Sequence, residues 1–190
     1  QETTSPGWFF EYANPYYPDN DTTAMVLTAL SKVEFSNEKS EQSRNLGIRE
    51  ALAWHLSMQN SDGGWSAFDK DCDKELLCHV PFADHNAMID PSNEDITARI
   101  LESLACLGHD RNDPAVRRAV QYLLRKQEQD GSWYGRWGCN YLYGTWLVLW
   151  GLQCIGEEMD TPAVHRAAAW LEGCQNDDGG WGDTDKSFSS

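Results

Sequence analysis

Two carboxyl groups and a phenol occupy matching positions in three similar segments of the chain. They are Asp21, Asp95 and Tyr143, and a threonine follows each of them two residues later. The segments are apolar around most of their circumference, as expected of helices that are buried on nearly all sides. If equivalent helix ends converge on one cavity, the two acids would share a low-dielectric pocket, where both cannot ionise cheaply. One of them would keep its proton at neutral pH, which predicts a strong general acid.

Two further charged residues accompany these acids. Asp19 lies two residues before Asp21, and Arg99 lies one helical turn after Asp95 on the same face. We expect Arg99 to pair chiefly with Asp19 or Asp95. Direct contact with Asp21 would favour loss of its proton and weaken the acid. In the alternative interpretation the three acids are only N-caps of helices, the first of which begins at Thr22.

Between these segments the chain repeats a short Gln-to-Trp motif three times. Each copy ends an amphipathic segment and contains Asp-Gly, whose glycine can take the positive φ that terminates a helix. The tryptophan is expected to lie over the helix end, and the glutamine amide is expected to bond to the neighbouring turn. Such residues are predicted to be structural, because repeats need interface residues to bury a continuous core. They are Gln59, Trp65, Gln127, Trp133, Gln175 and Trp181.

Each repeat is predicted to combine an apolar inner helix with an amphipathic outer helix. Asp113 and Thr161, each directly before a proline, are typical of N-caps that start outer helices. Three such hairpins make half of a ring of six, so the predicted fold is all-α, about half of an α/α toroid. Residues 1–190 are expected to be an excised part of a larger protein. Inner helices are expected near 20–33, 93–107 and 141–155, and outer helices near 41–59, 114–127 and 162–174.

Charge and composition exclude several classes of protein. The net charge is −15, and phosphate binding needs clusters of basic residues, so a nucleic-acid partner is not expected. The six cysteines lack zinc-finger spacing, and Cys106 and Cys154 are predicted to be small core residues of inner helices. The acids Asp69, Asp71 and Asp73 alternate as at the start of a calcium loop, but the glycine and glutamate that such a loop needs are missing. No metal site is predicted.

Several stretches of the chain together resemble the catalytic region of squalene–hopene cyclases. One is Tyr-Pro-Asp-Asn-Asp-Thr-Thr-Ala at positions 17–24, and the Gln-to-Trp motifs are similar to that family's own repeats. The resemblance covers essentially the whole chain, in order. It corresponds to a partial catalytic α/α barrel of a larger two-domain cyclase. The other matching stretches are residues 7–14, 63–69, 80–85, 90–99 and 135–144.

The resemblance implies a class II terpene cyclase. In such enzymes an aspartic acid protonates a terminal alkene and a cation then closes successive rings, without metal, cofactor or diphosphate ionisation. The family's Asp-x-Asp-Asp motif falls on residues 19–22 and makes Asp21 the proton donor. Thr22 departs from this motif, because hopene cyclases have Asp there and oxidosqualene cyclases have Cys.

The resemblance also implies roles for residues around the donor. Arg99 falls where some family members carry a His that partners the donor. Asp95 and Tyr143 match positions that organise the water network that returns the proton. Ring faces stabilise a carbocation by roughly 0.5–2 kcal/mol per contact without trapping it. Three aromatic residues match positions that line the cavity: Phe10, Phe68 and Trp137. Core packing is the alternative role for all three.

By the same resemblance, the substrate is a hydrophobic linear triterpene such as squalene, converted to hopene-type products. The full protein is expected on the cytoplasmic side of the cell membrane, with membrane contact through parts outside residues 1–190. Half a ring cannot close a water-excluding chamber. The chain alone is therefore expected to be inactive and to self-associate through its exposed inner faces, with a homodimer as one form.

Other functions stay open at this point. An oxidosqualene-like substrate fits Thr22, because an epoxide is easier to protonate than an alkene. Acid-rich α/α toroids also serve glycosidases and lyases, although the aromatic and aliphatic residues around the expected cavity favour a hydrocarbon over a sugar. A non-catalytic or decayed toroid module would tolerate the loss of the second carboxylate at Thr22.

Overall fold

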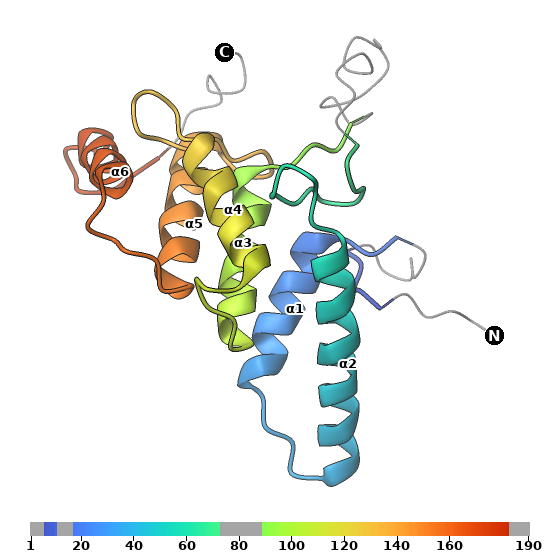
Figure 1. Ribbon diagram of the computed structural model, residues 1–190. Helices are drawn as coiled ribbons and strands as arrows, with labels where there is room; N and C mark the ends of the chain where they lie inside the picture. The colour runs from blue at the N-terminus through green and yellow to red at the C-terminus, as the bar shows by residue number, and fades with distance from the viewer. Residues whose placement is uncertain (1–5, 11–16, 73–88, 183–190) are drawn as a thin grey trace.

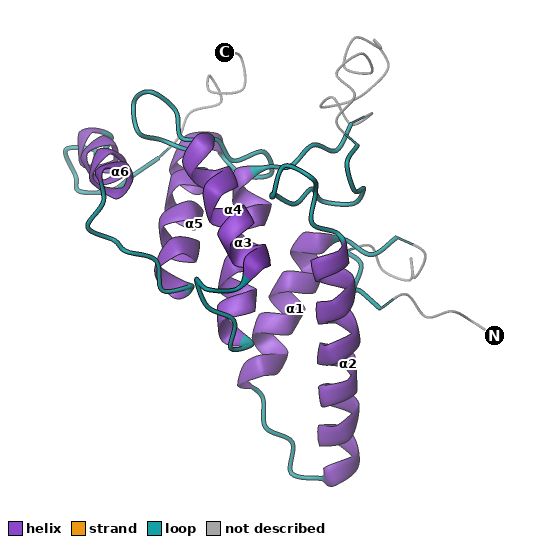
Figure 2. Ribbon diagram, viewed as in Figure 1, coloured by secondary structure: helices purple, strands orange, loops and turns teal. Residues whose placement is uncertain are grey.

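The computed structural model describes residues 6–10, 17–72 and 89–182, and these residues form helices and loops without a named strand (Figure 2). The predicted all-α fold is confirmed, and the expected helices agree with the observed ones to within a few residues. The helices are α1 (Asn20–Lys32), α2 (Glu38–Ser57), α3 (Glu94–Cys106), α4 (Pro114–Arg125), α5 (Asn140–Cys154) and α6 (Pro162–Gly173).

The six helices form three hairpins that lie side by side. Helix α3 lies between α1 and α5, so these three make an inner row. Each of them carries the next helix of the chain on its outer side: α2 on α1, α4 on α3 and α6 on α5. Figure 1 shows the hairpins following one another from the blue α1 to the red α6. Two such layers of helices form the arc that is expected of a segment of an α/α toroid.

The outer helices α4 and α6 begin as predicted. The Asp113 carboxylate accepts a hydrogen bond of 2.9 Å from the Ala115 amide, and the Thr161 hydroxyl accepts one of 3.4 Å from the Val164 amide. In both helices a proline follows the cap directly, where its missing N–H costs nothing. The helix starts are therefore set by local sequence.

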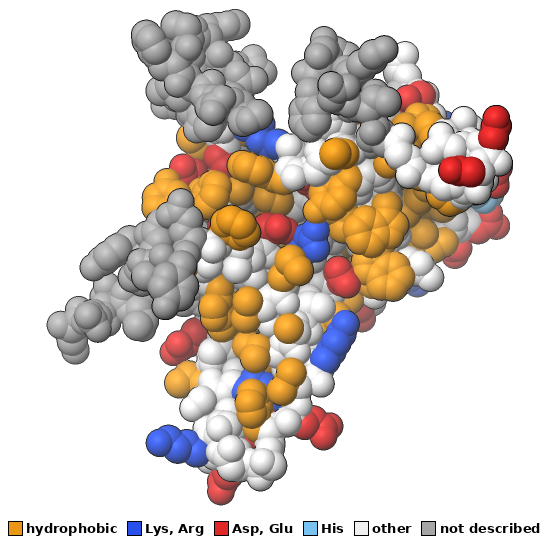
Figure 3. Space-filling view, turned by 180° about the vertical axis from the view of Figure 1, so that it is seen from behind, with side chains coloured by type: hydrophobic (Ala, Val, Ile, Leu, Met, Phe, Trp, Pro, Cys, Tyr) orange, Lys and Arg blue, Asp and Glu red, His pale blue; other side chains and the backbone are white. Residues whose placement is uncertain are grey.

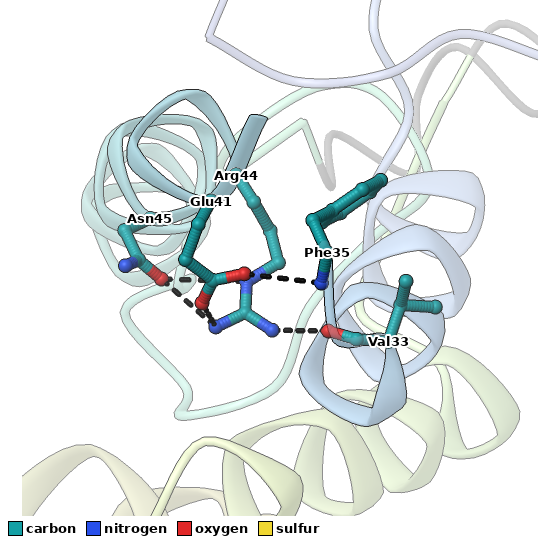
Figure 4. Close-up of polar contacts among 5 residues, drawn as sticks. All are labelled: Val33, Phe35, Glu41, Arg44 and Asn45. Carbon is teal, nitrogen blue, oxygen red and sulfur yellow. Dashed lines mark hydrogen bonds and ion pairs between the residues drawn. The ribbon is translucent and has the colours of Figure 1, made fainter. Parts of the chain in front are cut away.

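The connection between α1 and α2 is held by the side chain of Arg44 (Figure 4). Its guanidinium donates to the Val33 carbonyl, just past the end of α1, and pairs with the Glu41 carboxylate on α2. Glu41 in turn accepts a hydrogen bond of 3.3 Å from the Phe35 amide. These contacts tie the connecting loop to the first turns of α2.

The tryptophans of the three Gln-to-Trp motifs make one repeated contact. Each indole Nε1 donates to the backbone carbonyl of the residue ten positions earlier, near the end of the preceding outer helix. Trp65 and Trp133 are completely buried by this arrangement, whereas Trp181 is 51% exposed. The hydrogen bonds run from Trp65 to His55 (2.8 Å), from Trp133 to Leu123 (2.7 Å) and from Trp181 to Leu171 (2.8 Å).

The glutamines join one repeat to the next. The Gln59 amide donates to Gly63 in its own turn at 2.8 Å and to the Ala115 carbonyl in the first turn of α4 at 2.9 Å. Gln127 repeats both bonds, to Gly131 at 2.9 Å and to Ala163 of α6 at 2.8 Å. In addition, Arg118 and Arg166 donate to the oxygens of Gln59 and Gln127, respectively.

Two independent constraints require glycine in these turns. Gly63 and Gly131 have φ of 99° and 100°, which L side chains rarely adopt. A Cβ on Gly63 would also lie 2.6 Å from the Arg118 carbonyl oxygen, and one on Gly131 would lie 2.7 Å from that of Arg166. The close approach lets each turn pack directly on the next outer helix.

The hydrophobic core is centred on α3, α4 and α5. Inner helices also expose large apolar side chains, including Met25, Trp146 and Trp150. Figure 3 shows hydrophobic side chains gathered on the face turned away in Figure 1. The prediction that Cys106 is a core residue is wrong: it lies in the last turn of α3 and is exposed, and Cys154 is half-buried. Within the described residues no helix combines the length and hydrophobicity needed to cross a membrane.

The glutamine contacts generate a test with a matched control. Gln127→Leu should lower the free energy of unfolding by about 1–3 kcal/mol, because the carbonyls of Gly131 and Ala163 lose their shared donor. Gln175→Leu should cost less, since Gln175 is exposed and bonds to Gly179 of its own turn. Urea unfolding of both variants measures the difference. Equal losses would show that the bond between repeats adds no stability.

His55 generates a second test. It is buried against Trp65, and neither ring nitrogen has a hydrogen-bond partner among the described residues. Burial lowers the pKa of His55 from 6.5 to about 3. Because the unfolded chain binds the proton more readily, stability should fall by about 1.4 kcal/mol per pH unit as the pH drops from 6.5 towards 3. His55→Leu should flatten this dependence in urea unfolding. An unchanged slope would contradict the assignment.

Candidate active site

Three inner helices bring their matching ends together around one guanidinium. Arg99 of α3 lies with its Nε 2.6 Å from an Asp21 carboxylate oxygen on α1. The same guanidinium donates a hydrogen bond of 2.6 Å to the Tyr143 hydroxyl on α5. Asp21, Arg99 and Tyr143 thus form a continuous polar chain across the inner row.

A repeated hydrogen bond aligns the N-terminal ends of the three inner helices with one another. In each repeat the backbone N–H of a tryptophan donates to the hydroxyl of an inner-helix threonine at 2.9 Å. Because Asp21, Asp95 and Tyr143 each stand two residues before that threonine, they reach corresponding places on α1, α3 and α5. The pairs are Trp8 with Thr23, Trp65 with Thr97, and Trp133 with Thr145.

Trp8 was not recognised as part of this repeat in the sequence. It follows Gly7, as Trp65 follows Gly64, so the Gly-Trp pair was an available signal. The Trp8 carbonyl accepts from the Asp19 amide at 2.9 Å, and the Trp65 carbonyl accepts from the Asn93 amide at 3.0 Å. Residues 7 and 8 therefore anchor the start of α1 as residues 64 and 65 anchor the start of α3.

The pairing expected for Arg99 is wrong in its choice of partner. Among the described residues its ion pair is with Asp21, and not with Asp19 or Asp95. Burial raises the pKa of Asp21, the Arg99 charge lowers it, and the Asp19 charge raises it, with a net rise above the ordinary value. Burial thus outweighs direct contact with the cation, and the acid form of Asp21 is retained to higher pH than in water.

Asp95 is more deeply buried than Asp21, whose side chain is 40% exposed. Asp95 is 2% exposed, and one carboxylate oxygen accepts a hydrogen bond of 2.8 Å from the Trp137 amide. Burial raises the pKa of Asp95, the amides of Trp137 and Ile96 lower it, and the charge of Asp21 raises it, with a net rise. The cap of α3 is Asn93, so the interpretation of Asp95 as an N-cap is wrong.

Asp19 has the capping role, and Asp21 does not. The Asp19 carboxylate is the N-cap of α1 and accepts from the Thr22 amide at 2.6 Å. Asp19 is 4% exposed, and its second oxygen has no hydrogen-bond partner among the described residues. Thr22 is the residue that follows Asp21 in the first turn, and it is half-buried. A buried Asp19 places negative charge beside Asp21, which helps Asp21 keep its proton.

Two residues that were not predicted as site residues hold the turn that carries Phe68. Asn20 is fully buried and bonds to this turn through its amide N–H, to Ala67 at 2.8 Å, and through its side chain, to Ser66 at 2.8 Å. Asp90 accepts from the amides of Ala67 at 3.1 Å, of Asp69 at 2.8 Å, and of Phe68. The sequence offered two signals for these residues. Asn20 lies between two aspartates, and Asp90 directly precedes Pro91.

The aromatic residues expected around the acids are only partly brought together. Phe68 and Trp137 are in edge-to-face contact with ring centroids 6.4 Å apart. Tyr17, which was not predicted, lies 5.5 Å from Phe68 and extends the cluster. Phe10 is 86% exposed and has no ring contact with this cluster in the described part of the chain. Residues 80–85, which carry part of the resemblance, and Asp73 lie outside the described residues.

Comparison with protein families gives a match over the whole chain. The model of the squalene-hopene cyclase C-terminal domain matches residues 1–190. The chain belongs to the squalene–hopene cyclase family. A squalene-hopene cyclase from Schizosaccharomyces japonicus is 46% identical over 143 residues, which are 75% of this chain and 21% of that protein. One from Alicyclobacillus acidocaldarius is 45% identical over 145 residues, 76% of this chain and 22% of that protein.

The chain thus spans about a fifth of the length of these family members. Among solved structures, the type II terpene cyclase MstE from Scytonema superposes with a TM-score of 0.60. The superposition covers 90% of this chain and 45% of MstE at 20% identity, which supports the fold alone.

In this squalene–hopene cyclase family member, Tyr143 is positioned by a glycine. A Cβ on Gly138 would lie 2.2 Å from Cδ1 of the Tyr143 ring, so only glycine allows the loop before α5 to pass against that ring. Burial raises the pKa of Tyr143 while the Arg99 charge lowers it, with a net rise, so the phenol stays protonated near neutral pH. Gly138 is therefore a positioning residue for the polar chain.

Gly138→Ala should push the Tyr143 ring aside and break its 2.6 Å hydrogen bond with Arg99. We expect a loss of about 1–3 kcal/mol in the free energy of unfolding, as for other overpacked sites. A crystal structure of the variant and urea unfolding measure both effects. Gly47→Ala is the control, since a Cβ there meets nothing within 4 Å. An unmoved Tyr143 would refute the positioning role.

Proposed function

We propose that the protein containing this chain is a class II triterpene cyclase in which Asp21 starts the reaction by protonating a linear triterpene. The observation that carries the proposal is the state of Asp21. Burial raises its pKa although Arg99 lies 2.6 Å away, so the acid form of Asp21 is favoured more than in water, beside a group that stabilises the anion left by proton transfer. Residues 1–190 would form part of the catalytic α/α barrel of a two-domain enzyme.

Proton transfer breaks the O–H bond of Asp21 and forms a C–H bond on the less substituted carbon of the terminal alkene, which leaves a tertiary cation on the other alkene carbon. The Asp21 carboxylate then forms a full ion pair with Arg99, which is already in place. Because the guanidinium is held by Tyr143 before the reaction, little reorganisation is needed as the charge develops. Arg99 does not only weaken the acid. It also lowers the free-energy cost of proton transfer, because it stabilises the carboxylate that the transfer leaves.

The cation would next be stabilised by aromatic rings. Tyr17, Phe68 and Trp137 form a contiguous cluster, and the backbone N–H of Trp137 donates a hydrogen bond to the Asp95 carboxylate. Each ring face contributes about 0.5–2 kcal/mol to a nearby cation without forming a bond to it. The chemistry needs no metal or cofactor, and a hydrocarbon substrate fits such surroundings.

The proposed substrate is squalene, in keeping with the names of the hopene cyclases among the relatives. A second candidate is an oxidosqualene-like epoxide, and Thr22 favours it. Where the family motif has a second carboxylate beside the donor, this chain has a hydroxyl. An epoxide oxygen is far easier to protonate than an alkene, so it needs a weaker acid. For the whole protein we further propose contact with the cytoplasmic face of the membrane and a homodimer.

Substitutions at Asp21 and Thr22 in the full-length enzyme test this mechanism. Asp21→Asn should abolish turnover, because an amide cannot donate the proton. Thr22→Asp should raise the rate on squalene more than the rate on oxidosqualene. If the second carboxylate lowers the activation free energy of alkene protonation by about 1.4 kcal/mol, the rate on squalene rises by roughly tenfold. Both rates are measured by product analysis with each substrate.

The control for these variants is Thr28→Ser on the same helix, which keeps the hydroxyl and lies outside the polar chain. It should leave both rates close to those of the wild type. An active Asp21→Asn enzyme would refute the assignment of the donor. An equal response of the two substrates to Thr22→Asp would refute the role given to Thr22. Absence of any cyclisation by the wild type would favour a decayed module.

A further inference from the structure

A polar cavity of about 750 Å³ is lined in part by the start of α3, and its lining does not include Tyr17, Phe68 or Trp137 of the aromatic cluster. Its walls come from the turn after α2, the start of α3, the end of α4 and the loop before α5. The lining includes Asn60, Ser92, Glu94, Lys126, Tyr134 and Arg136. A cavity of this size with several polar groups is large enough and polar enough to hold a chain of water molecules.

Glu94 is the buried acid of this cavity. Its exposed fraction is 8%, and it directly precedes Asp95 in the first turn of α3. Burial raises the pKa of Glu94 to about 7, with Lys126 lowering it and Asp95 and Glu128 raising it. At neutral pH this carboxyl can therefore both accept and release a proton. No step of the mechanism above uses it.

The loop before α5 contacts both the cavity and the catalytic acid Asp95. Tyr134 and Arg136 of this loop line the cavity, while the amide of Trp137 donates to Asp95 at 2.8 Å. Arg136 also donates to the Ile89 carbonyl at 3.3 Å, which closes the cavity wall. Glu94 thus lines the cavity, and its neighbour in the chain, Asp95, is bonded to the loop that forms part of the cavity wall.

We propose that the cavity is the route by which solvent protons return to the catalytic acid, with Glu94 relaying them towards Asp95 and Asp21. This rests on the proposed function, because only an acid that is consumed in each turnover needs a supply. Asp21 loses one proton to the substrate, and the final cation loses one proton to water. One solvent proton must therefore reach Asp21 per cycle, and Glu94 is regenerated as it passes the proton on.

The charges around the cavity suit this role. Lys126 and Arg136 are balanced by Asp62, Asp71 and Glu128 on the same walls, so neither hydronium nor a buffer acid is strongly repelled. Tyr134 lines the cavity together with Glu94, and the charge of Glu94 acts on Tyr122 and Tyr141. Burial raises the pKa of Tyr122 and of Tyr141, so these two phenols stay neutral. Glu94, whose pKa is raised to about 7, is then a group at this end of α3 that titrates close to neutral pH.

The test is Glu94→Gln in the full-length enzyme, which keeps the size of the side chain and removes its proton. Asp21 starts each cycle protonated, so the first turnover should keep its rate within about twofold. Steady-state turnover should fall by about tenfold or more, and product should appear in a burst of one per enzyme. Imidazole buffer, raised at constant pH and ionic strength, should restore steady-state turnover, because imidazolium can enter the cavity and replace the relay.

Glu50→Gln, an exposed site on α2, is the control and should show neither the burst nor the buffer dependence. A purely structural role for Glu94 would lower the first and later turnovers together and would not respond to buffer. That result, or unchanged steady-state turnover, would overturn the inference while leaving the proposed function intact. If the variant is poorly folded, steady-state turnover of one preparation with and without imidazole still distinguishes a relay role from a structural role of Glu94. A wild type without cyclase activity would overturn both.

Discussion

The hydrogen bond from a tryptophan amide to an inner-helix threonine is the constraint on which the rest of the structure depends. It recurs at Thr23, Thr97 and Thr145, always at 2.9 Å. Each bond ties the turn that ends one repeat to the first turns of the next inner helix. Because the bonds are equivalent, α1, α3 and α5 present corresponding residues at the same end. The site is therefore a consequence of the repeat, and its chemistry lies in the residues that differ between repeats.

Those differing residues create a balance between burial and ion pairing. Removing Asp21 from water favours its neutral form, whereas the adjacent Arg99 favours the carboxylate. The capping carboxylate of Asp19 adds negative charge beside Asp21, and the buried Asp95 is held by the Trp137 amide. A general acid needs both properties: it must hold a proton at rest and be stabilised after losing it. Burial supplies the first property and the guanidinium supplies the second.

The parts of this arrangement that depend on local sequence could be predicted. Helix boundaries followed from proline starts, caps such as Asp113, and glycine turns such as Gly131, because these act within a few residues. The convergence of Asp21 and Tyr143 followed from matching positions in a repeat. The partner of Arg99, the exposure of Cys106 and the anchoring role of Asp90 did not follow. They depend on distances between helices that no local pattern contains.

The sequence by itself determined the helices, their order, the repeat and the family, because these are set by periodicity and by motifs of neighbouring residues. Only the tertiary structure decided which charges meet and how deeply they are buried. It placed Arg99 on Asp21, separated Phe10 from the aromatic cluster, and put Glu94 in the lining of a polar cavity. The physical reason is that electrostatic energies depend on distance and solvent exposure, and both arise only when the helices pack.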